Sequence, residues 1–86
     1  MARVTIRYWA AAKEAAGVPE DTVEAGTLAQ ALDAALARRD PDGRLGRVVA
    51  RSSFLVDGAP VGRRILADLA LHDGAVIEVL PAFAGG

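Results

Sequence analysis

The chain has 86 residues, 52% of them hydrophobic, and a formal net charge of −1 at neutral pH. This length predicts one domain, and the small net charge argues against nucleic acid or an anionic membrane as the main partner, because their binders are usually strongly basic. The absence of cysteine excludes disulfides, thiolate nucleophiles and cysteine-ligated metals.

Residues 3–9 alternate polar and apolar side chains, which predicts a half-buried strand with Val4, Ile6 and Tyr8 facing inward. Trp9 falls on the opposite face, either as a rim residue packed on a neighbouring loop or as part of a partner-binding patch. A strand interrupted by arginines is not a signal peptide, and no apolar run approaches the ~20 residues that span a bilayer. We therefore expect a soluble cytoplasmic domain.

Residues 10–16 are strong helix formers, and Gly17 is a natural helix stop. After the Val18-Pro19 break, residues 22–25 fit a short strand that returns along the first one. The opening of the chain thus predicts strand, short helix and strand.

The main helix is predicted to begin after Thr27, because Thr27 and Gln30 have the spacing of a capping box. It should run to about Arg38 or Arg39, whose positive charges suit the C-terminal end of the helix dipole. One apolar stripe follows helical spacing: Leu28, Ala31, Leu32, Ala35 and Leu36.

Residues 44–52 have both helical and strand features, and we favour a short helix or an irregular segment. In a helix, the arginines at positions 44, 47 and 51 would share one face. That face is either ordinary solvated surface or a contact for an acidic groove on a partner.

Residues 54–61 predict a hairpin around a tight Asp57-Gly58 turn. Further core contacts are expected from Leu66, Leu69 and Leu71, and His72 is read as an ordinary turn residue with no second metal ligand in sight. Residues 75–80 form an apolar, β-branched final strand that should lie in the centre of the sheet. One amphipathic helix against one mixed sheet is an α+β layout.

The chain closes with Pro81-Ala82-Phe83-Ala84-Gly85-Gly86. Glycine loses the most entropy on ordering and has no side chain to bury, so this end is poorly suited to a fold. It is well suited to thread a narrow channel and present a carboxylate. We therefore divide the chain into a domain, 1–80, and a reactive tail, 81–86.

Each tail residue has an expected role. Pro81 should end the strand's hydrogen bonding, because it has no N–H group, and set the direction of the tail. Phe83 should anchor the tail in a partner pocket, with folding back onto its own sheet as the alternative. Trp9, Leu80 and Phe83 are predicted to form one partner-binding patch. Ala82, Ala84 and Gly85 would enter the partner, with Gly86 as the reactive residue.

Two stretches together resemble the MoaD/ThiS group of ubiquitin-like sulfur carriers. Residues 7–17, RYWAAAKEAAG, are similar to the opening strand and F-A-x-x-R-E-x-x-G segment of molybdopterin synthase small subunits. Residues 71–74, LHDG, with 79–86, VLPAFAGG, are similar to that family's L-x-D-G-D-E-V…P-P-x-x-G-G close. The resemblance covers essentially the whole chain and implies a β-grasp, ubiquitin-like fold with a flexible Gly-Gly tail.

The chain departs from that pattern at several positions. Trp9 and Lys13 replace the usual phenylalanine and arginine, and Ala75-Val76 replaces an acidic pair. Ala82 replaces a second proline, and a Pro-Ala close also occurs in carriers that serve cysteine biosynthesis. The tail therefore leaves the pathway open, whereas the opening segment favours molybdopterin.

The resemblance implies that an ATP-consuming, E1-like adenylating enzyme (MoeB/ThiF-like) activates the Gly86 carboxylate. A sulfurtransferase would supply the sulfur of a thiocarboxylate, which a large, MoaE-like synthase subunit would use to build molybdopterin. The chain itself would bind no cofactor or metal and would supply no catalytic side chain. The alternatives are a carrier for thiazole or cysteine biosynthesis, a ubiquitin-like protein modifier, and an interaction module with no tail chemistry.

Overall fold

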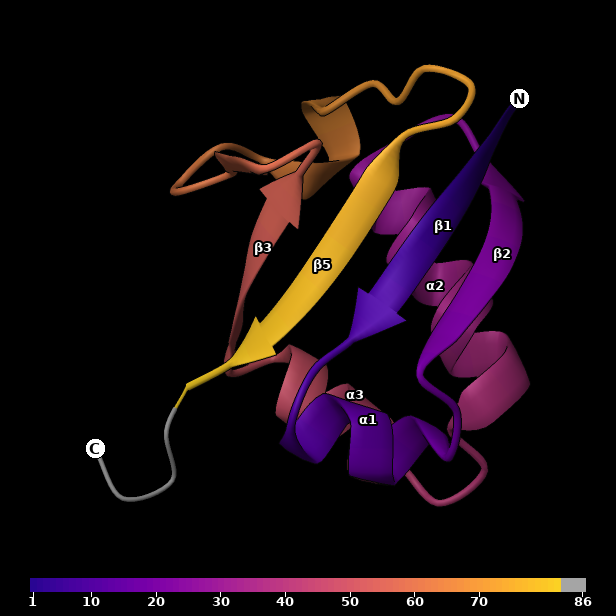
Figure 1. Cartoon of the computed structure of the whole chain (residues 1–86), viewed down its shortest axis with the longest axis vertical. Coiled ribbons are helices and arrows are strands. Elements are labelled where there is room, and N and C mark those ends of the chain that lie inside the picture. The colour runs from indigo at the N-terminus through magenta and orange to yellow at the C-terminus, as the bar shows by residue number, and fades with distance from the viewer. Residues whose placement is uncertain (83–86) are drawn as a thin grey trace.

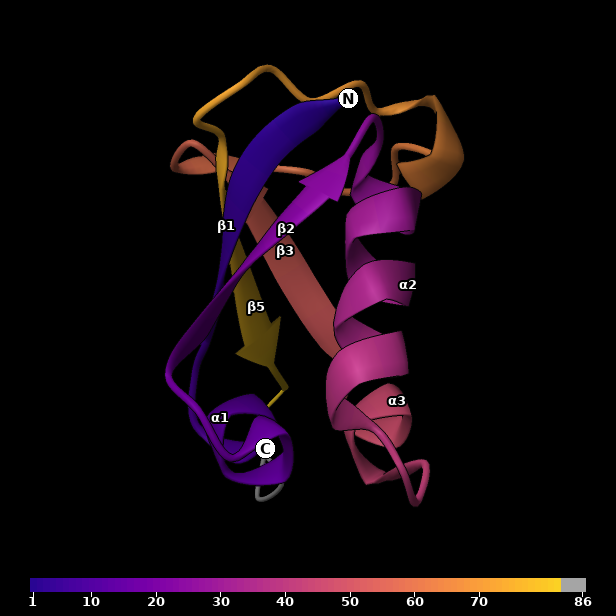
Figure 2. The ribbon, with the colours of Figure 1, turned by 90° about the vertical axis from the view of Figure 1, so that its right-hand side faces the viewer.

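The computed structural model describes residues 1–82, which form a mixed sheet with the longest helix on one face and a short helix at one end of the strands (Figures 1 and 2). Their elements, in chain order, are β1 (Ala2–Tyr8), α1 (Ala11–Ala16), β2 (Glu20–Ala25), α2 (Leu28–Arg39), α3 (Arg44–Val49), β3 (Ser52–Val56), β4 (Ala59–Pro60), the 3₁₀ turn η1 (Leu66–Asp68) and β5 (Val76–Pro81). The expected α+β, ubiquitin-like β-grasp architecture is confirmed.

The sheet has the strand order β2-β1-β5-β3-β4, so the last strand lies at its centre. Strand β5 runs parallel to β1 and antiparallel to β3. The central position of β5 agrees with the prediction from its β-branched, apolar sequence. The first and last strands are neighbours, and α2 lies along one face of the sheet, to its right in Figure 2.

The core lies between the sheet and the helices, where the largest fully buried side chains are Val4, Ile6, Leu28, Leu45, Ile77 and Val79. Four members of the predicted α2 stripe are buried, and Leu36 is partly buried against the core. Alternation of burial along β1 also follows the sequence pattern, because Val4, Ile6 and Tyr8 point inward.

Local signals placed the ends of the helices correctly. Thr27 Oγ1 accepts a hydrogen bond from the Gln30 N–H group (3.2 Å), while Gln30 Oε1 accepts from the Gly26 N–H group (2.8 Å). Gly17 adopts the left-handed conformation (φ 79°) that a helix C-terminus favours. The ambiguous segment 44–52 contains α3, as we favoured, followed by the start of β3.

Asp21, in β2, is a buried carboxylate that the sequence did not single out. It accepts a 2.8 Å hydrogen bond from the Tyr8 hydroxyl and is paired with Arg38 (3.3 Å) and Arg39 (2.8 Å). Burial opposes ionisation of Asp21, but the hydrogen bonds from Arg39 and Tyr8 outweigh it and hold its pKa below the ordinary value. Burial and the hydrogen bond to Asp21 both raise the pKa of Tyr8. The two arginines thus bind a specific carboxylate as well as suiting the helix dipole.

His72 joins the loop before β5 to the hairpin. Its Nε2 lies 2.5 Å from Asp57 Oδ2, and its Nδ1 lies 2.8 Å from the Asp73 carbonyl oxygen. Because both ring nitrogens face acceptors, the doubly protonated imidazolium fits best. The hydrogen bond to Asp57 raises the pKa of His72 above 6.5, whereas the Val76 N–H group and then His72 lower the pKa of Asp57.

The first prediction concerns the buried carboxylate. Asp21→Ala should lower the free energy of unfolding by about 2 kcal/mol, because it leaves the Tyr8 hydroxyl without its acceptor while Arg38 and Arg39 remain partly hydrated. Urea unfolding measures this, with exposed Asp33→Ala as the control. Because the pKa of Asp21 is lowered on folding, its contribution is present above pH 3.8 and is lost as the pH falls through its folded value. Equal stabilities of the two variants would contradict this role.

The second prediction concerns His72. NMR titration should give its ring a pKa above 6.5, and Asp57→Asn should move that pKa down towards the ordinary value. A raised histidine pKa stabilises the fold below pH 6.5, and this contribution is lost as the pH rises through the folded value. Asp68→Asn, a change in η1, should leave the titration unchanged. An unaltered His72 titration in Asp57→Asn would show that the pair does not form in solution.

Candidate functional site

The candidate site is the end of β5, where the domain continues into the first residues of the predicted tail. Leu80 and Pro81 pair with Ser53 and Ser52 of β3. One residue further, the Ala82 N–H group donates a 3.2 Å hydrogen bond to the Arg51 carbonyl oxygen. The base of the tail is therefore attached to the sheet through Ala82.

The expectation that Pro81 ends the strand's pairing is wrong. Successive N–H groups along a strand point to opposite sides, and the Val79 carbonyl faces β1, where it accepts from the Trp9 N–H group (3.2 Å). The nitrogen of Pro81 faces that same side, beyond the last residue of β1, Tyr8. Its missing N–H group therefore removes no bond to β3, and the pairing with β3 continues.

Leu80 and Trp9 lie together on the sheet face opposite the helices. Tyr8 is paired with Val79 in the parallel ladder, and both are buried, so the following residue of each strand turns to the open face. The Trp9 side chain is 47% exposed. Two residues of the predicted patch are thus neighbours; that the patch binds a partner stays a prediction.

A hydrogen bond fixes the indole of Trp9. Its Nε1–H group donates to Glu78 Oε1 at 3.1 Å, across the β1–β5 ladder. Trp9 therefore bonds to the neighbouring strand rather than only packing on a loop. Sequence reasoning missed Glu78, although a single carboxylate on the open face of an otherwise apolar strand was a signal that could have identified it.

The turn after β1 is also specific. Ala10 has φ 49°, in the left-handed region that disfavours a residue with a Cβ atom, and α1 begins at the next residue. The Trp9 carbonyl oxygen accepts from the Ala12 N–H group at 3.0 Å. This sharp turn ends the pairing of β1 with β5 at Val79, so Leu80 and Pro81 pair only with β3.

The remaining tail positions, Phe83, Ala84, Gly85 and Gly86, lie outside the described residues. The roles assigned to them stay predictions, as does the boundary between domain 1–80 and tail 81–86. The structure adds that Pro81 itself belongs to β5.

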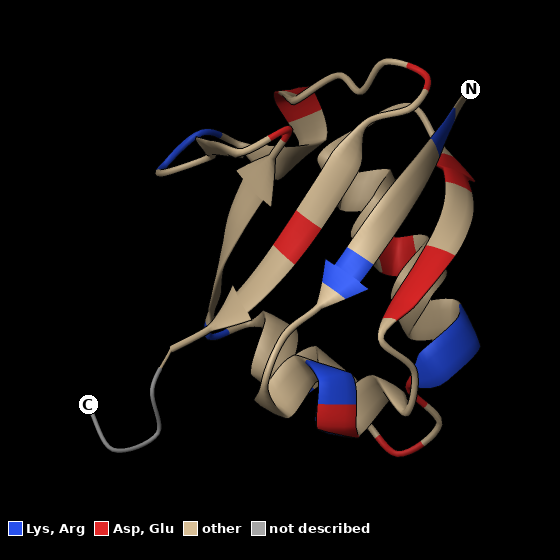
Figure 3. Ribbon diagram, in the orientation of Figure 1, with Lys and Arg blue, Asp and Glu red and all other residues tan. Residues whose placement is uncertain are grey.

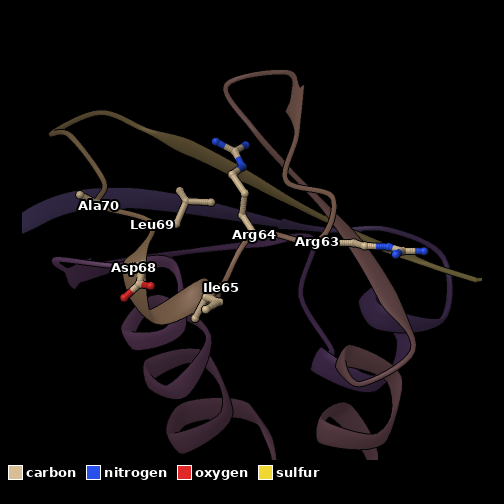
Figure 4. Close-up of a pocket in the computed structure, with 6 residues that line it drawn as sticks. All are labelled: Arg63, Arg64, Ile65, Asp68, Leu69 and Ala70. Atoms are coloured by element: carbon tan, nitrogen blue, oxygen red, sulfur yellow. The ribbon is translucent and has the colours of Figure 1, made fainter.

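A separate hollow lies in the loop between β4 and β5, far from the end of β5 (Figures 1 and 4). Arg64 closes this loop by donating to the carbonyl oxygens of Val61 (3.1 Å) and Pro60 (3.0 Å). Arg63 points in another direction, and Ile65 is 66% exposed. The hollow shares no residue with the base of the tail.

Among residues 1–82 there is no group of three acidic or histidine side chains placed to hold a metal ion. In the same part of the chain, no helix is long and apolar enough to cross a membrane.

The fold and the anchored strand end define a β-grasp domain that carries a C-terminal extension on its central strand. The family model described as the ThiS family matches residues 6–86. The chain belongs to this family, as the resemblance predicted. A comparison with curated proteins gives no match.

Solved structures share the fold. The small archaeal modifier protein 1 from Methanosarcina acetivorans is 22% identical with a TM-score of 0.84, over 100% of this chain and 98% of that one. A putative molybdopterin converting factor subunit 1 from Pyrococcus furiosus is 21% identical (TM-score 0.77), over 96% and 100%. Subunit 1 in a complex of subunits 1 and 2 of the molybdopterin-converting factor from Helicobacter pylori is 24% identical (TM-score 0.69), over 98% and 99%.

The third prediction tests the Trp9–Glu78 contact. Trp9 is the only tryptophan, so fluorescence anisotropy reports on it alone. Glu78→Ala should lower the anisotropy, because the indole loses its acceptor, while stability changes by about 1 kcal/mol or less. Glu78→Gln keeps a carbonyl acceptor at the same place and should retain the anisotropy. Identical values for all three proteins would mean that the hydrogen bond does not restrain Trp9.

Proposed function

We propose that the chain is a sulfur carrier for the biosynthesis of molybdopterin, with the Gly86 carboxylate as the group that carries sulfur. The observation that carries this proposal is the placement of Pro81 and Ala82, at the base of the predicted tail. In a chain of the ThiS family, matched through Gly86, Pro81 belongs to the central strand and Ala82 is still bonded to the sheet. Rigid support at the base lets a short arm present its end in one direction.

The chemistry needs no side chain of this protein. An oxygen of the Gly86 carboxylate attacks the α-phosphorus of ATP in the activating enzyme, and pyrophosphate leaves. Hydrosulfide (HS⁻) then attacks the acyl carbon, AMP leaves, and loss of the proton on sulfur gives the thiocarboxylate. Activation is required because a carboxylate is a poor electrophile. This scheme is compatible with a chain that has no cysteine.

The partners follow from the scheme. An E1-like enzyme of the MoeB/ThiF kind would adenylate Gly86, a sulfurtransferase would provide sulfur, and a MoaE-like large subunit would accept the tail. A partner of the last kind is supported by the Helicobacter pylori neighbour, which is described as a complex of two subunits. The Trp9–Leu80 patch, with Phe83, would contact that subunit, and the catalytic side chains would belong to it.

A second candidate is a ubiquitin-like modifier, in which Gly86 forms isopeptide bonds with lysines. The observation that favours it is the similarity in fold to small archaeal modifier protein 1. Sulfur transfer to thiazole or cysteine remains an alternative within the carrier proposal, because the Pro81-Ala82 close does not distinguish these pathways.

The fourth prediction separates carrier from modifier. The protein is incubated with ATP, an E1-like activating enzyme and a sulfide source, and its intact mass is measured. Replacement of oxygen by sulfur should add about 16 Da at the C-terminus. A series of conjugates with other proteins would instead show a modifier.

Two controls complete this experiment. Deletion of Gly86 should abolish the mass change, whereas Arg63→Gln, at an exposed position in the loop after β4, should retain it. The mass of the protein isolated from its source tests whether Gly86 bears the free carboxylate. Unmodified wild-type protein under conditions that convert a known carrier would contradict the proposal. Molybdopterin formation with an added large subunit then tests the pathway.

A further inference from the structure

An arginine-lined hollow lies on α3 and the turn that follows it. We call it the arginine hollow; its lining consists of Arg44, Arg47, Val48, Ala50 and Arg51. The three arginines follow at i, i+3 and i+7, the spacing that places side chains on one helical face. Each arginine is exposed, and the half-buried Val48 adds an apolar wall.

The carboxylates nearest in sequence are occupied elsewhere. Asp40 accepts from the N–H groups of Leu45 (2.8 Å) and Gly46 (3.1 Å), and Asp42 accepts from the Arg44 N–H group (3.0 Å). The ion pairs found among residues 1–82 involve Arg38, Arg39 and His72. In this part of the chain, therefore, no carboxylate lies within 4.0 Å of the guanidinium groups of the hollow. The hollow thus presents three positive charges without an internal partner in this part of the chain.

The arginine hollow adjoins the base of the tail. Arg51 both lines the hollow and accepts, through its carbonyl oxygen, the hydrogen bond from Ala82. The open face of the sheet differs, because acidic and basic positions are interspersed there (Figure 3). A protein that receives the tail therefore meets a concentrated positive charge on the helical side of the domain.

We propose that the arginine hollow docks a carboxylate-rich surface of the E1-like activating enzyme when that enzyme takes up the tail. The inference rests on the proposed function only for the identity of that protein. Guanidinium groups are suited to carboxylates because their planar fork can donate two parallel hydrogen bonds. A nucleic acid fits poorly, because the chain as a whole carries a net charge of −1. Docking beside Arg51 would fix the direction in which the tail enters and speed association.

The fifth prediction uses a decaglutamate peptide as the probe, titrated into the full chain at low salt and followed by NMR. The amide resonances of Ala50 and Ala82 and the side-chain resonances of Arg44, Arg47 and Arg51 should shift. Arg44→Gln/Arg47→Gln/Arg51→Gln should weaken binding about tenfold, as expected for three partly screened ion pairs. Added salt should weaken the wild-type interaction.

A charge-matched control separates the hollow from net charge. Arg3→Gln/Arg7→Gln/Arg63→Gln replaces three exposed arginines outside the hollow. Each triple variant removes three positive charges from a chain whose net charge is −1. The control should retain affinity within about threefold, since only distant charges change. Equal losses in both variants would overturn the proposal.

Other occupants are distinguished by parallel titrations. Tighter binding of inorganic phosphate or of single-stranded oligothymidylate than of decaglutamate would assign the hollow to a small anion or a nucleic acid. Shifts of the three arginines on amidation of the C-terminal carboxylate, without any peptide, would assign it to the chain's own carboxyl end. Either result would overturn the proposal.

A kinetic arm links the hollow to the tail. With an E1-like activating enzyme, the hollow variant should show a raised KM for the carrier and an unchanged kcat, and the control variant should resemble wild type. Complete absence of adenylation in the wild type would defeat the proposed function, whereas the peptide titration would still decide whether the hollow binds carboxylates.

Discussion

The parallel pairing of β1 with β5 is the contact on which the rest of the molecule depends. It joins the first and last strands, for example Ile6 to Ile77, and both of these side chains are fully buried. Closing so long a loop is entropically costly, and burial of the β-branched side chains under α2 offsets that cost. Because β5 is inserted between β1 and β3, the tail starts from the centre of the sheet and not from an edge.

Polar contacts hold the elements around this strand pair in place. The Tyr8–Asp21–Arg39 cluster fastens β1 to β2 and to the end of α2, while His72 and Asp57 tie the loop before β5 to the hairpin. At the end of β5 the contacts are different. Trp9 is held by Glu78 but half exposed, and the arginines of α3 have no carboxylate partner among residues 1–82. At this end of the domain, an aromatic surface and several guanidinium groups are therefore available to contact another protein.

The sequence predicted those features that depend on local signals or on a strong burial pattern. The cap at Thr27, the helix stop at Gly17, the Asp57-Gly58 turn and the central place of β5 belong to this group. Contacts that depend on the register of distant strands could not be predicted from the sequence. The hydrogen bond from Trp9 to Glu78 and the ion pair between Arg39 and Asp21 are two such contacts. Pro81 removes no hydrogen bond to β3, because its nitrogen faces the side where β1 has already ended. No local pattern contains this information, because each of these contacts depends on which residue of another element lies opposite.

The base of the tail, Pro81 and Ala82, continues the strand that we expect to be the most stable part of the fold. Native-state hydrogen exchange of the full chain measures this stability residue by residue. Paired amides of β1 and β5 should exchange only through global unfolding, more slowly than those of β2 and β4, and the Ala82 amide should be measurably protected. Exchange of β5 through local opening, faster than β2, together with an unprotected Ala82, would contradict this expectation and would show that the base of the tail is not held by the sheet.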